Sequence, residues 1–260
     1  MEAGKHVLVE KPMAMNADEA ERMLRAAERS GMKLMVGLNN RWRSDVQALK
    51  SFVDDGVLGE VYFSKAECLR RRGIPGWGVF TQKDKQGGGP LVDLGVHIMD
   101  LALYLMGYPE AVRASGATYT KFGTRGDVVG LMGQWDPKKF TVEDFALGLV
   151  RFKNGGTMFV ETSFAANIGK DSFNLALLGT QAGLTLDPPR IYGEKHMVLT
   201  DTSPAMLREV NTHEVEMRKF VECILRDEEP PVTAQEGLAL QRIMDAIYRS
   251  AELGREVEIL

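Results

Sequence analysis

The first forty residues read as a strand, a helix and a second strand. An apolar run at 6–9 precedes a helix that Asn16 and Glu19 can cap and Gly31 can end, and a second apolar run lies at 33–37. A strand–helix–strand unit of this length normally has parallel strands and a right-handed crossover. Parallel sheets need cover on both faces, so two such strands make a poor sheet on their own. The unit therefore predicts the end of a larger doubly wound domain.

Beyond residue 40 the pattern changes. We expect helices over 44–54, 91–106, 213–226 and 234–253, and strands over 60–67, 111–119, 145–152, 157–164, 172–178 and 184–186. Asn154-Gly155-Gly156 between two of these strands is typical of a hairpin. The sequence thus predicts an α+β protein, with a residual βαβ piece at 1–40 and a second domain at 41–260. That domain would be an antiparallel or mixed sheet with helices on one face.

Composition excludes several classes of protein. The 260 residues are 44% hydrophobic and 26% charged, with a net charge of -4, so we expect no nucleic acid or anionic membrane as partner. The basic run Arg70-Arg71-Arg72 is interpreted as solvated surface. Cys68 and Cys223 show no metal-ligand spacing, which predicts reduced thiols, no metal and a cytoplasmic protein. No signal peptide is evident, and we expect no membrane span, since no apolar run approaches about 20 residues.

Residues 87–107 give the clearest indication of chemistry. On a helix, Asp93, His97, Asp100 and Tyr104 follow at spacings of four, three and four and share one face of an otherwise apolar segment. Such a polar stripe predicts a cavity or a polar seam. Asp93 could then fix the tautomer of the His97 imidazole, and His97 could exchange protons near neutral pH. A structural Asp–His pair in the core is the alternative.

Other candidates lie at strand ends and in loops. Lys11 follows the first strand, and ligands of open α/β sheets bind beyond the carboxyl ends of strands, although a solvated lysine is the alternative. The Lys11–Pro12 bond could be cis. Arg41 follows the second strand, and Trp77 lies in a loop that could cover a pocket. Gly87-Gly88-Gly89 could let a ligand approach the backbone.

Three of these motifs together support a family resemblance. Glu10-Lys11-Pro12, Gly87-Gly88-Gly89 and Asp93-x-x-x-His97, in this order, resemble the GFO/IDH/MocA family of NAD(P)-dependent oxidoreductases. The closing segment, from Phe220 through Glu-Val-Glu-Ile at 256–259, is also similar. The resemblance implies an N-terminal Rossmann domain, of which 1–40 is a remnant, and a C-terminal domain on an open, mostly antiparallel sheet. It also implies oxidation of a hydroxyl of a sugar, inositol or related polyol, or the reverse reaction.

The resemblance further implies residue roles. Lys11 would bind and polarise the reacting oxygen, Asp93 would help bind substrate, and His97 would take the hydroxyl proton as hydride leaves to the cofactor. The cofactor-binding set would be Glu10, Lys11 and Pro12, with Pro12 beside the nicotinamide. Arg41 and Trp77 would lie near the substrate.

The glycine-rich phosphate loop of the family is missing from these residues. No G-x-G-x-x-G opens a helix, and only ten residues precede Lys11. We therefore expect a truncated Rossmann domain and a chain that alone binds neither NAD nor NADP and is inactive. Two other interpretations remain: a non-catalytic sugar-binding or oligomerising remnant, and a cofactor-free lyase or isomerase that uses Lys11, Asp93 and His97.

The later strands also predict self-association. Phe145, Leu147 and Leu149 alternate onto one face, and Met158 and Val160 are expected to oppose them nearby. A sheet with helices on one side only leaves the other face partly apolar, and large apolar patches mark interaction sites. We expect a homodimer or tetramer packed through this face.

Overall fold

The computed structural model describes residues 1–260 without a gap, and its elements are distributed along the whole chain. The strands are β1 (Val7–Glu10), β2 (Leu34–Gly37), β3 (Val61–Leu69), β4 (Ala111–Tyr119), β5 (Phe145–Phe152), β6 (Thr157–Ser163), β7 (Ser172–Gly179), β8 (Ala182–Thr185), β9 (Arg190–Lys195), β10 (Val198–Thr202) and β11 (Val257–Glu258). The α-helices are α1 (Ala17–Ser30), α2 (Ser44–Asp54), α3 (Lys83–Gln86), α4 (Val96–Met106), α5 (Thr212–Leu225) and α6 (Ala234–Leu253). Short 3-10 turns lie at Asn39–Trp42 and Pro137–Lys139, and a π-helical turn at Leu91–Gly95 leads into α4.

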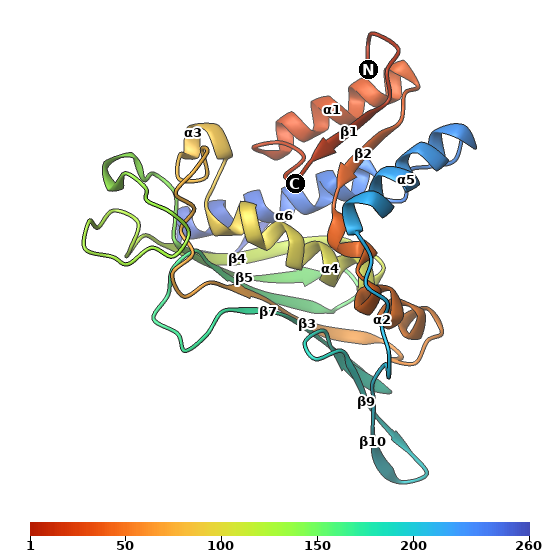
Figure 1. Ribbon diagram of the computed structural model, residues 1–260. Coiled ribbons are helices and arrows are strands. Elements are labelled where there is room, and N and C mark those ends of the chain that lie inside the picture. The colour runs from red at the N-terminus through yellow and green to blue at the C-terminus, as the bar shows by residue number, and fades with distance from the viewer.

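Nine of the strands form one open sheet, and helices α4 and α6 lie across one of its faces (Figure 1). The strand order is β10-β9-β8-β7-β3-β6-β5-β4-β11. Only β3 and β6 are parallel; every other neighbouring pair is antiparallel. The predicted α+β class, with an open and mostly antiparallel sheet, is confirmed.

The first forty residues form the predicted βαβ piece. β1 and β2 pair in parallel, with Val7 opposite Leu34 and Glu10 opposite Gly37, and form a separate two-stranded sheet. Asn16 caps α1 by accepting a hydrogen bond from the Glu19 amide, as its sequence position predicts. The piece packs through α1 against α6, above the large sheet (Figure 1).

The pleat of the large sheet decides which side chains meet the helices. A Cβ on Gly148 of β5 would lie 2.7 Å from Ile247 of α6, so this strand turns its even-numbered residues toward the helices. Leu147 and Leu149 therefore point to the uncovered face, as predicted. The expectation for β6 is wrong: Met158 and Val160 are fully buried on the helix side, because their register pairs them with Val150 and Gly148.

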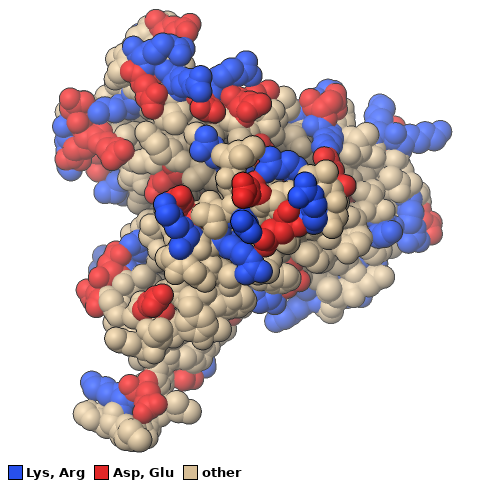
Figure 2. Space-filling view, turned by 180° about the vertical axis from the view of Figure 1, so that it is seen from behind, with Lys and Arg blue, Asp and Glu red and all other residues tan.

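One buried segment meets the length and composition of a membrane span. Lys83–Met106 has 24 residues, which corrects the expectation that no stretch reaches that length, and 83% of its apolar window is buried inside the fold. Its C-terminal part, helix α4, packs on β3 and β7, as a core helix does. On the face shown in Figure 2, basic and acidic side chains are mixed, without a wide area of one sign, in line with the net charge of -4.

Candidate active site

A cavity of about 390 Å³ opens where the end of β1, the π-helical turn, α4 and the strands β3 and β7 meet. Its ten lining residues are Lys11, Cys68, Leu69, Arg70, Asp93, Leu94, His97, Asp171, Ser172 and Phe173. The fold thus brings the predicted Lys11, Asp93 and His97 to one cavity, although 82 positions separate Lys11 from Asp93. A larger cavity of about 600 Å³ beside α1 is lined mainly by methionine and other apolar side chains. Convergent polar groups favour the smaller cavity as the site of chemistry.

Lys11 is held in place by Asp93. The Lys11 ammonium donates to the Asp93 side-chain Oδ1 and to its backbone oxygen, each at 2.9 Å. The two side chains are 18% and 9% exposed, so the ion pair is largely shielded from water. An ammonium has three N–H donors, and the third remains for an oxygen of a bound ligand. The Lys11–Pro12 peptide bond is cis.

His97 lies half-buried on the wall of the same cavity, and it is neutral. Burial, followed by the positive charges of Lys11 and Arg70 and by His213, lowers its pKa to about 3. Its Nδ1 is buried without a hydrogen-bond partner. A neutral imidazole keeps one nitrogen lone pair free to accept a hydrogen bond from a bound ligand.

The expected hydrogen bond between Asp93 and His97 is wrong. The Asp93 carboxylate is bound to Lys11 instead. Asp93 also lies in the π-helical turn and His97 in the following α-helix, so the angular spacing of a regular α-helix does not hold between them. The predicted polar stripe divides into two groups: Asp93 and His97 line the cavity, and Asp100 and Tyr104 contact Arg41.

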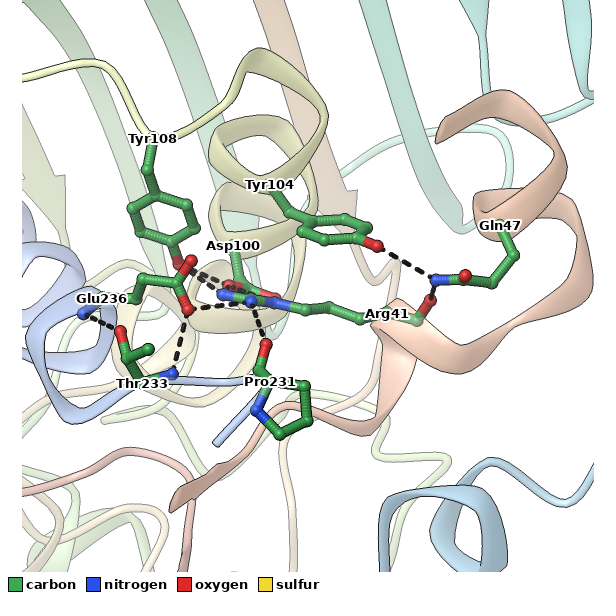
Figure 3. A network of polar contacts seen from close by, with 8 residues as sticks. All are labelled: Arg41, Gln47, Asp100, Tyr104, Tyr108, Pro231, Thr233 and Glu236. Carbon is green, nitrogen blue, oxygen red and sulfur yellow. Dashed lines mark hydrogen bonds and ion pairs between the residues drawn. The ribbon is translucent and has the colours of Figure 1, made fainter. Parts of the chain in front are cut away.

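Arg41 does not reach the cavity, which corrects its predicted place near a substrate. Its side chain is 1% exposed and lies between α4 and α6, where the Nε and Nη2 groups donate to the Asp100 carboxylate at 3.0 and 2.6 Å. Nη1 pairs with Glu236 at 3.0 Å, and Nη2 also lies 2.9 Å from the Tyr108 hydroxyl (Figure 3). The guanidinium lies over the Tyr104 ring (Figure 3). Arg41 therefore ties the turn after β2 to α4 and α6.

The structure corrects two further expectations from the sequence, one for Trp77 and one for the triplet Gly87-Gly88-Gly89. Trp77 is 53% exposed, packs edge-on against Phe80 and lies outside the cavity lining. The glycine triplet meets the protein itself: a Cβ on Gly88 would collide with the Tyr248 hydroxyl, and one on Gly89 with the Glu143 backbone. Gly88 and Gly89 therefore serve close packing against Tyr248 and Glu143.

Residues 10–19 provide no phosphate cradle for a dinucleotide. Pyrophosphate needs free amides at a helix N-terminus, but two of the first three α1 amides are already bound. Ala17 N–H donates to Asp245 at 2.7 Å, and Glu19 N–H donates to Asn16 at 2.9 Å. Glu10 is exposed at the end of β1, and Pro12 lines the larger apolar cavity. The α1 N-terminus therefore does not fit the phosphates of NAD(P).

Sequence reasoning missed two polar cavity residues, Arg70 and Asp171. Arg70 directly follows β3, and Asp171 directly precedes β7, so the antiparallel pairing of these strands brings the two residues together. A prediction of that pairing would have found them, but the basic run at 70–72 was interpreted as surface. The neighbouring Cys68 is not a nucleophile, because burial raises the pKa of its thiol to about 12. No group of three metal-ligating side chains occurs in the structure.

Glu216 of α5 is a buried acid beside this region. It is 3% exposed, and its Oε1 has no hydrogen-bond partner. Burial, followed by the charge of Glu10, raises its pKa to about 7. The His213 side chain lies near it, with Nδ1 3.9 Å from the Glu216 Oε2.

Glu216→Gln is expected to raise the free energy of unfolding at pH 8 but not at pH 4. Below the ordinary carboxyl value of 4.5 the acid is protonated in both folded and unfolded chains. Between 4.5 and about 7 only the unfolded chain ionises, so stability falls as pH rises. Glu216→Gln should therefore gain about 1–3 kcal/mol at pH 8 and close to nothing at pH 4. Urea denaturation at both pH values measures this, with the exposed Glu209→Gln as control. An equal gain in stability at both pH values would contradict the raised pKa of Glu216.

Comparisons with known proteins find matches over nearly the whole chain. The sequence profile described as "Oxidoreductase family, C-terminal alpha/beta domain" matches residues 50–259, and "Oxidoreductase family, NAD-binding Rossmann fold" matches residues 1–38. D-glucoside 3-dehydrogenase of Escherichia coli is 39% identical over all of this chain and 74% of its own length. The scyllo-inositol 2-dehydrogenase (NADP(+)) of Bacillus subtilis is 29% identical over 99% of this chain and 73% of its own.

A solved structure supports the fold. The aldose-aldose oxidoreductase of Caulobacter crescentus, complexed with glycerol, matches with a TM-score of 0.80 and 28% identity. The match covers 99% of this chain and 73% of that protein. The matched part is therefore about three quarters of each of these larger proteins.

Proposed function

Because this chain belongs to the GFO/IDH/MocA oxidoreductase family, we propose that its cavity binds a sugar or polyol and that Lys11, Asp93 and His97 act on the hydroxyl that is oxidised. The observation that carries the proposal is the shielded Lys11–Asp93 ion pair beside a neutral His97 in a cavity of about 390 Å³. Sugar and inositol dehydrogenases are among the relatives of the chain.

The proposed chemistry follows from the charges around the cavity. The free N–H of the Lys11 ammonium binds the substrate oxygen, and Asp93 fixes the direction of that ammonium. A nearby positive charge stabilises a developing alkoxide. Burial, together with these positive charges, keeps His97 unprotonated, so its lone pair faces the hydroxyl and takes its proton as the hydride leaves. NAD(P), when bound, supplies the acceptor for the hydride.

We assign Glu10, Lys11 and Pro12 to the border of the nicotinamide end. The occupied amides of α1 support a second candidate function for these 260 residues by themselves: sugar binding without turnover. The two candidates share the cavity and differ in the cofactor, so a substrate-binding experiment tests what they have in common.

Loss of the ammonium is expected to weaken sugar binding about tenfold or more, because a hydrogen bond from a charged donor contributes about 1.5–3 kcal/mol. Saturation-transfer NMR with methyl β-D-glucoside and with myo-inositol compares the wild type with Lys11→Met. The control is Lys5→Met, since Lys5 is exposed. Unchanged binding by Lys11→Met, or binding of neither probe by the wild type, would overturn the proposal.

We also propose assembly through the uncovered face of the sheet. Leu149 and Phe159 are paired neighbours there and are half-buried in the single chain. The ion pairs of Lys65 with Glu67 and Glu161, at 2.8 and 3.0 Å, lie next to them and leave one negative charge. A face with both apolar side chains and fixed charges suits association of two copies.

Light scattering at micromolar concentration is expected to show a dimer or tetramer. Leu149→Asp should shift the protein to monomer, because it places a carboxylate in the apolar part of the face. Val129→Asp, in a loop where Val129 is 66% exposed, is the matched control. A wild type that is monomeric throughout this concentration range would refute the assembly.

A further inference from the structure

We propose that Arg70 and Asp171 form a subsite that binds two neighbouring hydroxyls of an uncharged sugar, on the strand side of the cavity. The inference rests on the proposed function and specifies the substrate class. Lys11, Asp93 and His97 come from β1, the π-helical turn and α4, whereas Arg70 and Asp171 continue β3 and β7. The two groups therefore line different walls of one cavity.

The strand register brings the two side chains together. In the β3–β7 ladder Cys68 pairs with Phe173 and Leu69 with Ser172, so the next position sets Arg70 opposite Asp171. Residues two apart in a strand share a face. Arg70 therefore follows Cys68, and Asp171 follows Phe173, onto the side of the sheet that faces α4, and all four residues line the cavity.

Both side chains have unused hydrogen-bonding capacity. The Arg70 guanidinium makes one long hydrogen bond, from Nη1 to the Gly73 backbone oxygen at 3.3 Å, and no carboxylate lies within 4.0 Å of it. Asp171 accepts the Arg71 amide at 2.8 Å through Oδ1, which leaves Oδ2 without a partner. The two opposite charges are cross-strand neighbours that form no ion pair, and both keep hydrogen-bonding groups free at the cavity.

Backbone contacts fix the position of both groups. A Cβ on Gly73 would collide with the aliphatic part of the Arg70 side chain, so this glycine lets the arginine fold back over the loop. The Arg71 amide holds the Asp171 carboxylate from the other strand. The subsite is therefore preorganised, which reduces the entropy lost on binding.

The chemistry of the pair matches a diol. Arginine only donates and a carboxylate only accepts, whereas each sugar hydroxyl does both. Two adjacent hydroxyls can therefore accept from Arg70 and donate to Asp171 at once. Lys11 and Arg70 balance Asp93 and Asp171 among the charged residues of the cavity lining, so the cavity provides no net attraction for a carboxylate or phosphate. An uncharged sugar is the substrate class that this balance favours.

The test compares methyl β-D-glucoside with methyl β-D-glucuronoside, which differs by a carboxylate, in binding titrations followed by NMR. We expect the wild type to prefer the glucoside at least about fivefold, and Arg70→Gln to weaken glucoside binding about tenfold. Asp171→Asn should reverse the preference, since it leaves the Arg70 charge unbalanced. The control is Arg72→Gln, because Arg72 bonds to Ala166 and Asn167 outside the cavity lining.

The possible outcomes separate this inference from the proposed function. Glucoside binding with an unchanged preference in both Arg70→Gln and Asp171→Asn would overturn the subsite and leave the proposed function standing. A wild type that binds neither sugar would overturn both. If Arg70→Gln does not fold by circular dichroism, the direction of the preference in Asp171→Asn decides the question alone.

Discussion

Asp100→Ala is expected to destabilise the protein by about 3–5 kcal/mol, because it leaves the Arg41 guanidinium buried without its main partner. Both side chains of this ion pair are 1% exposed, so water cannot replace the lost carboxylate. Glu236 and Tyr108 remain in contact with the guanidinium (Figure 3), but neither restores the two-point contact from Nε and Nη2. Urea denaturation followed by far-UV circular dichroism measures the loss.

A second Arg–Asp pair in the chain provides a matched control for Asp100→Ala. Arg125 donates to Asp127 through Nε and Nη2 at 3.0 and 2.8 Å, but these side chains are 51% and 72% exposed. Asp127→Ala should therefore leave stability nearly unchanged, because solvent screens an exposed pair. Equal effects of the two substitutions would contradict the view that the Arg41 network ties the βαβ piece to the large domain.

A protein made of these 260 residues alone is expected to bind NADH and NADPH no more tightly than about the millimolar range. Phosphate recognition supplies several charge-assisted hydrogen bonds of about 1.5–3 kcal/mol each. The Ala17 and Glu19 amides at the α1 N-terminus are already bound to Asp245 and Asn16, and the NAD-binding profile matches only residues 1–38. Binding should therefore be weaker than that of a complete nucleotide-binding domain by orders of magnitude, and no polyol should be turned over.

Calorimetric titration with both cofactors measures this affinity. The informative comparison is the same chain preceded by a glycine-rich nucleotide-binding half-domain, which should restore micromolar binding if the phosphate site is all that these residues lack. Micromolar affinity of the 260 residues alone would show that another part of the molecule holds the phosphates, and would contradict this account.

Local signals predicted most of the fold. The predicted bounds 44–54, 111–119, 145–152 and 234–253 are those of α2, β4, β5 and α6. Thr233 and Glu236 form the capping box that opens α6, as their spacing predicts. These elements are amphipathic along their length. Their hydrophobic periodicity can be read from the sequence without knowledge of the tertiary structure.

The missed strands lack such a signal. β10 is exposed at every position, so its sequence shows no buried face. The turn before it places His196 and Met197 at φ of 54° and 62°, where glycine or asparagine is usual. β11 has only two residues and forms by pairing with β4. Such strands form because they pair with other strands in the tertiary structure, and a local sequence pattern does not reveal that pairing.

The site was predicted in part for the same reason. Lys11, Asp93 and His97 could be found because strand ends and a polar stripe in an apolar helix are local features. The bond between Lys11 and Asp93, and the place of Arg41 in the core, depend on which segments meet across the fold. A glycine triplet likewise has the same sequence signature whether a ligand or Tyr248 lies against it.

The central claim is that His97 is a neutral base in a sugar-binding cavity, and NMR of the histidine rings tests it most directly. The chain has four histidines, so each ring can be assigned with a single substitution. Burial, with Lys11 and Arg70, lowers the His97 pKa to about 3, so its ring should stay neutral from pH 5 to pH 8. Saturating methyl β-D-glucoside should shift the His97 signals and leave those of His6 and His196 unmoved. A His97 ring that titrates near its ordinary value of 6.5, or that does not respond to the sugar, would contradict the account.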